Sequence, residues 1–137
     1  MSISENTLRR AILACSGAAF VCALFLPALL FKQHKAALGI DVFLSGWLGV
    51  VTLNFAWYAN PAYALALRQF SAMQYAHARL ACAIALALGM LSFFAREWWF
   101  NEGSGTPIAG LGIAFYFWMS SFGLLLVGSF LLKEPND

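Results

Sequence analysis

The chain has 137 residues, of which 62% are hydrophobic and only 10% are charged, and its mean hydropathy is +0.76. A soluble domain carries about 25% charged residues, so this composition excludes an ordinary water-soluble globule and indicates a single-domain integral membrane protein. The formal net charge of +2 is too small to indicate a nucleic-acid partner.

The first apolar segment covers about residues 9–31 and begins at the pair Arg9-Arg10. A helix needs about 20 apolar residues to cross a bilayer, and this segment is long enough. A cleaved signal peptide is the competing interpretation, but its apolar core is only about 7–15 residues long and ends at a small-residue cleavage site. This segment is longer, contains Pro27 and has no such site, so we expect a first transmembrane helix.

The second apolar segment, about residues 40–59, is interrupted by polar residues and glycines more than any other apolar segment of the chain. We interpret it as the segment around which the others are organised. Pro61 cannot continue a regular helix, and a proline disfavours the helical conformation at the residue before it, here Asn60. We therefore expect a second transmembrane helix that ends near Ala59.

Two polar side chains in the second segment are candidate functional residues, Asp41 at its start and Asn54 deep inside it. A carboxylate at a helix start meets free N–H groups and the positive end of the helix dipole, which favours a capping role for Asp41 over an ion pair with a nearby base. A side-chain amide in lipid is stabilised by a partner on another helix, so Asn54 is predicted to link helices. Contact with a substrate or a protein partner is the alternative role of Asn54.

Small and aromatic residues complete the candidate interaction surface of the second segment. Gly46 and Gly49 remove side-chain bulk beside Trp47, which lets another helix approach, in this chain or in a second copy. Asn54 follows Gly46 by eight residues, close to the same helical face. The run from Trp57 to Pro61 (WYANP, with Asn60) is interpreted as an interface anchor followed by the helix stop.

Residues 62–79 are less apolar, and two interpretations stay open for them: a helix at the membrane interface, or an extension of a neighbouring helix. A third transmembrane helix is predicted over about residues 79–96, where Ala81, Ala85 and Gly89 recur at every fourth position and allow close packing. The fourth is predicted over about residues 107–132, with its first residue a proline, after a loop over residues 101–106.

The fold class predicted from these segments is an all-α integral membrane four-helix bundle with short connecting turns. Orientation follows from the Lys and Arg residues, which favour the cytoplasmic side. Both termini are expected in the cytoplasm, because the loops on their side hold more of the basic residues: Arg9, Arg10, Arg68, Arg79 and Lys133, against Lys32, Lys35 and Arg96.

No catalytic, metal or cofactor site is predicted. The three cysteines form no C-x-x-C pair and are expected to pack as small buried hydrophobes, and the two histidines fall in turns rather than inside the bundle. No acidic or basic residue falls centrally within a predicted span, where transporters that use a membrane carboxylate place one.

The motif Gly46-Trp47-x-Gly49, followed by Trp57-Tyr58-Ala59-Asn60-Pro61, resembles small four-span bacterial inner-membrane proteins of unassigned function. The first functional hypothesis is a non-enzymatic interaction protein of the bacterial inner membrane, in contact with membrane lipid and with a protein partner. Its sharpest form is an immunity protein against a membrane-acting toxin, and a second copy of the chain is the other candidate partner. The alternative is a small oligomeric transporter or channel subunit with a path lined by Asp41, Asn54, Ser120 and Ser121.

Overall fold

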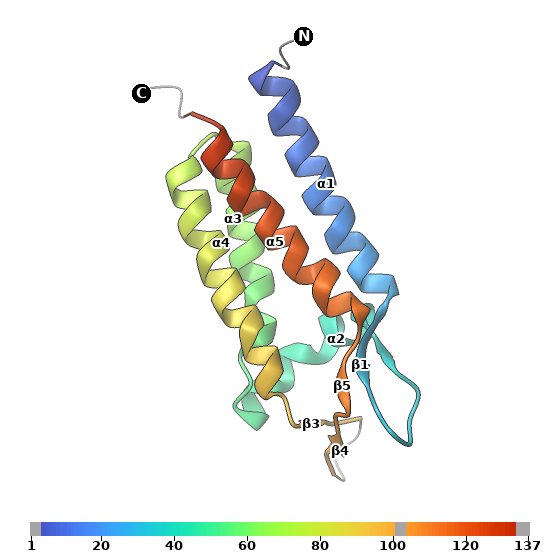
Figure 1. Ribbon diagram of the computed structural model, residues 1–137. Helices are drawn as coiled ribbons and strands as arrows, with labels where there is room; N and C mark the ends of the chain where they lie inside the picture. Colours follow the sequence, from blue (N-terminus) through green and yellow to red (C-terminus); the bar gives the residue numbers. More distant parts are fainter. Residues whose placement is uncertain (1–3, 101–103, 134–137) are drawn as a thin grey trace.

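The computed structural model of the protein describes residues 4–100 and 104–133, and it is mostly helical (Figure 1). Four helices run side by side: α1 (Glu5–Phe25), α3 (Ala59–Ser71), α4 (Tyr75–Met90) and α5 (Ile113–Leu131). The start of α1, the α3–α4 turn and the end of α5 share one end of the molecule, here called the terminal end. The short helix α2 (Gly39–Ser45) and the strands lie at the opposite end, here called the strand end.

Three helical stretches are long and apolar enough to cross a membrane: Glu5–Phe25, Tyr75–Phe94 and Ile113–Leu131. The middle one includes η3 (Leu91–Phe94), the 3₁₀ turn that continues α4. Helix α3 has 13 residues and is therefore about 20 Å long, which is shorter than the hydrocarbon core of a bilayer. The prediction of a mostly helical chain with long apolar helices is confirmed. Helix α3, however, is too short to be a full-length span.

The predicted transmembrane helix over residues 40–59 is wrong. The segment folds instead as α2, the 3₁₀ helix η1 (Gly46–Thr52) and the 3₁₀ turn η2 (Ala56–Tyr58). Leu53, between η1 and η2, has a φ of 57°, and a residue in this left-handed conformation ends a right-handed helix. Asn60 and Pro61 lie in the first turn of α3, where a proline is tolerated because its missing N–H has no helical partner. The proline therefore marks a helix start, not the expected helix stop.

Strands replace the predicted ends of the first and last spans, so the expectation of an all-α fold needs correction. Helix α1 ends two residues before the strand β1 (Pro27–Leu30), and α5 begins six residues after the predicted start at Pro107. A three-stranded antiparallel sheet has the order β2-β1-β5, with β2 at Ala37–Leu38 and β5 at Gly110–Leu111; a two-stranded sheet pairs β3 (Glu97–Trp98) with β4 (Thr106–Pro107).

Two glycines permit the close backbone contacts of the strand end. A Cβ at Gly39 would overlap the carbonyl of Ala23, and a Cβ at Gly112 would overlap the carbonyl of Pro27. The Gly112 N–H donates to the Ala28 carbonyl oxygen at 2.8 Å. These contacts hold the starts of α2 and α5 against the end of α1 at the strand end of the molecule. The predicted loop over residues 101–106 falls partly outside the described residues.

Residues 62–79 do not form a separate interfacial helix, and only their last part, from Tyr75, extends a neighbouring predicted helix. They form most of α3, the turn and the start of α4, and α3 packs antiparallel against α4 (Figure 1). Phe70 and Tyr75 are fully or almost fully buried in the core between the helices, where their rings are in edge contact. Ala81 and Ala85 are buried in this packing, as their four-residue spacing predicts.

A buried polar contact joins three helices in the middle of the molecule. The Ser16 hydroxyl of α1 donates to the Ser121 carbonyl oxygen of α5 at 2.8 Å. A serine has one proton to donate, so the Tyr63 hydroxyl of α3 donates to Ser16 Oγ at 2.6 Å. The Tyr63 ring also stacks on Phe20 and packs against Phe122. These side chains fill the interior between the strand end and the terminal end.

Candidate functional site

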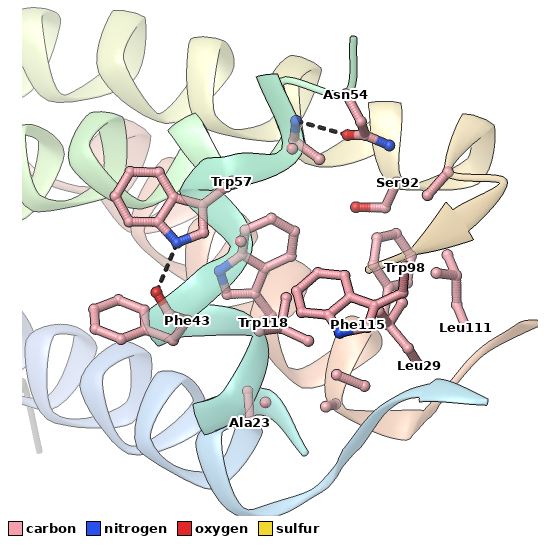
Figure 2. Close-up of a pocket in the computed structure, with 18 of the residues that line it drawn as sticks. Ala23, Leu29, Phe43, Asn54, Trp57, Ser92, Trp98, Leu111, Phe115 and Trp118 are labelled. Atoms are coloured by element: carbon pink, nitrogen blue, oxygen red, sulfur yellow. Dashed lines mark hydrogen bonds between the residues drawn. The ribbon is translucent and has the colours of Figure 1, made fainter. Parts of the chain in front are cut away.

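A cavity of about 130 Å³ lies at the strand end, enclosed by the end of α1, the strand β1, the segment from α2 to η2, the turn after α4 and the start of α5. Figure 2 shows its walls in close-up. Its aromatic lining consists of Phe20, Phe43, Trp57, Trp98, Phe115 and Trp118. A water molecule needs roughly 10–15 Å³ of such space, so the cavity has room for an organic group.

The cavity forms because residues 40–58 fold as short helical pieces instead of one continuous helix. Helix α2 and the two 3₁₀ segments cross the strand end instead of running along the other helices. Gly46 and Gly49 of η1, together with Ala56 of η2, therefore line one wall. Ala23 at the end of α1 and Ala114 at the start of α5 also line the cavity.

Hydrogen bonds hold two of the tryptophans in place. The Trp57 indole N–H donates to the Phe43 carbonyl oxygen at 2.8 Å, which is drawn as a dashed line in Figure 2. The Trp118 indole N–H donates to Asn60 Oδ1 at 2.9 Å, and Asn60 Nδ2 donates to the Trp57 carbonyl oxygen, also at 2.9 Å. Asn60 thus links the aromatic side chain of α5 to the chain that precedes α3, and the aromatic wall is pre-organised.

Asn54 stands between the cavity and a second, neighbouring hollow of about 310 Å³. Its Oδ1 accepts from the Ala56 N–H at 3.0 Å, and its Nδ2 donates to the Leu91 carbonyl oxygen at 3.4 Å. The second bond is longer than the usual range of about 2.7–3.2 Å and is therefore weak. The inter-element partner expected for Asn54 is thus present, on η3, the 3₁₀ turn that continues α4.

Two polar groups that line the cavity were not singled out from the sequence: the Ser92 hydroxyl and the Trp98 indole N–H. Figure 2 shows the Ser92 hydroxyl directed into the cavity. Neither group has a hydrogen-bond partner within residues 4–100 and 104–133. No local sequence signal connects either residue to a site, because both reach the cavity through the fold of η3 and β3.

Charge is nearly absent from the cavity. Glu97 is the one residue among those lining it that carries a charge at neutral pH. Successive side chains of a strand point to opposite sides, so Glu97 is directed away from the side taken by Trp98. The Glu97 carboxylate lies beside Gly105, where a Cβ would overlap it. In the described part of the chain, no group of three or more His, Cys, Asp or Glu side chains could hold a metal ion.

Of the residues predicted from the second segment, the cavity brings together Gly46, Gly49, Asn54, Trp57 and Asn60. The other three lie outside it. The Asp41 carboxylate accepts the Leu38 N–H at 3.0 Å at the start of α2, which is the geometry of the capping interpretation. Trp47 is half exposed on the outer side of η1, and Pro61 is exposed on α3.

The expectation that Gly46 and Gly49 face another helix needs correction. A Cβ at Gly46 would lie 2.6 Å from Cδ1 of Trp57, and a Cβ at Gly49 would lie 2.6 Å from the Asn54 carbonyl oxygen. Both glycines therefore pack against the next turn of their own segment. The shared helical face of Gly46 and Asn54 does not exist, because no continuous helix joins them.

The cysteines differ in their surroundings. Cys82 is fully buried in α4 and packs in the core, as expected. Cys15 and Cys22 are exposed on α1, so the prediction that they are buried is wrong for this chain alone. Their spacing of seven residues places them on the same face of the helix.

Comparison of the chain with protein-family models, with curated proteins and with solved structures finds no match. The resemblance to four-span bacterial inner-membrane proteins therefore stays a prediction. The cavity has to be interpreted from its own geometry and chemistry.

Proposed function

We propose that the protein is a non-enzymatic, multipass membrane protein that acts by binding, and that the cavity at its strand end receives an apolar group supplied by the membrane. The observation that supports this proposal is the cavity itself, whose lining includes six aromatic side chains, two of them held in place by hydrogen bonds. Small-molecule sites in proteins are concave and mostly apolar, with a few polar groups that orient the ligand. This cavity has that composition.

The chemistry of the lining favours binding over catalysis. General acid–base and nucleophilic catalysis need a titratable or activated group within hydrogen-bonding reach of the reacting atom. Among the described lining residues, Glu97 alone carries a charge, and its carboxylate lies toward Gly105. Ser92, the hydroxyl directed into the cavity, has no described base as a hydrogen-bond partner. We therefore assign the site a recognition role.

The distribution of charge supports an orientation for this binding protein. The basic residues near the terminal end are Arg9, Arg10, Arg68, Arg79 and Lys133, against Lys32, Lys35 and Arg96 at the strand end. The positive-inside rule then places the terminal end in the cytoplasm. The strand end, with exposed Trp47 and Trp99 as an aromatic belt, lies at the outer interface of a bacterial inner membrane in this proposal.

The transport alternative gains less support from the structure. Asn54 borders the cavity and Asp41 caps α2, whereas Ser120 is exposed and the Ser121 hydroxyl donates to the Trp118 carbonyl oxygen of its own helix. Within one copy, the four residues form no shared path. The immunity form of the interaction hypothesis remains a prediction, and a toxin gene next to this one would favour it.

The binding proposal is tested by filling the cavity. Ala114 lines it from α5 and is almost fully buried, so Ala114→Leu places three additional carbon atoms in the space. Ala83→Leu adds the same atoms on the exposed face of α4 and serves as the matched control. The probe is 1-bromodecane, whose bromine quenches tryptophan fluorescence, titrated into protein in lipid nanodiscs.

We expect a saturable quenching component in the wild type and in Ala83→Leu, and its loss in Ala114→Leu. The exposed tryptophans give only a linear component, because the probe reaches them from the bilayer without binding. Equal saturable quenching in all three proteins would overturn the proposal, and so would its absence from the wild type.

A further inference from the structure

We infer that the ligand of this cavity is an uncharged amphiphile, with an apolar chain or ring and a carbonyl oxygen that accepts hydrogen bonds from Ser92 and Trp98. This inference rests on the proposed binding function and adds the chemical class of the ligand. It follows from which polar groups of the lining are already paired and which are not.

Three acceptors of the cavity lining already have donors. Asn60 Oδ1 accepts from the Trp118 indole, and Asn54 Oδ1 accepts from the Ala56 N–H. The Phe43 carbonyl oxygen accepts from the Trp57 indole. A ligand that offers only donors would therefore find few partners among these groups.

Three lining groups that can donate have no described partner or only a weak one. They are the Ser92 hydroxyl and the Trp98 indole N–H, together with one N–H of Asn54, whose amide makes a single bond of 3.4 Å through its nitrogen. An indole nitrogen can only donate, so Trp98 specifically requires an acceptor. A ligand carbonyl oxygen would give these donors an acceptor.

The charges of the described lining, which are limited to Glu97, restrict the ligand further. No Lys, Arg or His side chain lines the cavity, so an anionic head would be desolvated without a counter-charge. The aromatic rings would attract a cation, but the Glu97 carboxylate that would complete such a site lies toward Gly105 instead. An uncharged head with an acceptor is the chemistry that remains.

The position of the cavity at the strand end suits such a ligand. The aromatic belt marks the interfacial region of a bilayer, where polar head and apolar chain meet. Two membrane constituents share the required chemistry at this depth: the ester carbonyl of an acyl lipid and the ring carbonyl of a quinone. The experiment below separates them.

The test measures competition against the saturable quenching by 1-bromodecane, with 2-undecanone and undecane as competitors of equal carbon number. One hydrogen bond contributes about 1 kcal/mol, so the ketone should compete about fivefold more strongly than the alkane in the wild type. In the double variant Ser92→Ala/Trp98→Phe, this preference should fall to about one while undecane competes as before. Ser120→Ala/Trp99→Phe, at exposed positions outside the cavity lining, is the matched control and should keep the preference.

Equal competition by the ketone and the alkane in the wild type would overturn the inference and leave the binding proposal intact. Stronger competition by decyltrimethylammonium than by 2-undecanone would also overturn it, because it would show a cation site. Absence of saturable quenching in the wild type would instead remove the proposed function itself. If the inference holds, methyl decanoate and a decyl-substituted benzoquinone compete against each other, and the stronger one identifies an ester or a quinone as the natural source.

Discussion

The contact between Ser16 and Tyr63 should be strongly non-additive when its two hydroxyls are removed. Both side chains are buried, and they lie on different helices, 47 positions apart in the chain. Tyr63→Phe leaves Ser16 with its bond to the Ser121 carbonyl oxygen, so only the bond of 2.6 Å is lost. Ser16→Ala leaves the Tyr63 hydroxyl in the core without the oxygen to which it donates.

The two losses differ in size for a physical reason. Removal of one hydrogen bond with no group left unpaired costs about 0.5–1.5 kcal/mol, whereas a buried donor without a partner costs about 1–3 kcal/mol. The Ser121 hydroxyl also interacts with Tyr63, so the lower half of the second range is expected for Ser16→Ala. The double variant leaves no buried hydroxyl of the pair behind. It should therefore be no less stable than Ser16→Ala alone.

The assay is reversible unfolding of the wild type, the two single variants and the double variant in mixed micelles, followed by tryptophan fluorescence as the denaturing detergent is increased. The coupling free energy comes from the four unfolding free energies as a double-mutant cycle. If the two single losses add up in the double variant, Tyr63 and Ser16 do not depend on each other, and the proton assignment given above is wrong.

Three further predictions follow from the same structure. Gly46→Ala should destabilise the protein by about 1–3 kcal/mol, because the new Cβ would lie 2.6 Å from Cδ1 of Trp57. Gly123→Ala is the control and should not destabilise it, because the space around its new Cβ is open. Equal unfolding free energies of the two variants would refute the packing argument. Cys15→Ala and Cys22→Ala should each change the unfolding free energy by less than about 0.5 kcal/mol, since both positions are exposed; a large loss would show a contact beyond this chain. Reporter fusions should place both termini and the α3–α4 turn in the cytoplasm and the loop before α5 outside, and a terminus on the outer side would contradict the orientation.

The long apolar helices were predictable because they depend on composition over many residues. About 20 apolar residues in a row have few alternatives to a membrane helix, and the α1, α4 and α5 stretches follow this rule. The second segment is apolar to a similar degree, yet it folds as short helical pieces. The decisive feature is the left-handed conformation of Leu53, for which leucine carries no local signal. A proline can stand just after the end of a helix or in the first turn of a helix. The sequence therefore could not show whether Pro61 follows one helix or begins the next.

The candidate site, like the fold, was predictable from the sequence only in part. Asn54, Trp57 and Asn60 were singled out as unusual polar and aromatic residues in an apolar segment, and they line the cavity. Asn54 was expected to link helices, whereas Trp57 and Asn60 were expected to anchor the chain at the membrane interface and to end a helix. The structure shows instead that all three line a wall built by short helical pieces that cross the strand end. Ser92 and Trp98 could not be connected to these residues, because their position depends on how the chain after α4 folds back across the strand end.

The most direct test of the central claim, that the cavity holds a ligand taken from the membrane, is native mass spectrometry of protein extracted from its membrane in mild detergent. The account predicts that the wild type and Ala83→Leu carry an adduct of defined mass and that Ala114→Leu does not. After release of the adduct, its fragments should identify an uncharged carbonyl amphiphile. A wild type without any adduct, or an adduct that Ala114→Leu retains to the same extent, would contradict the account.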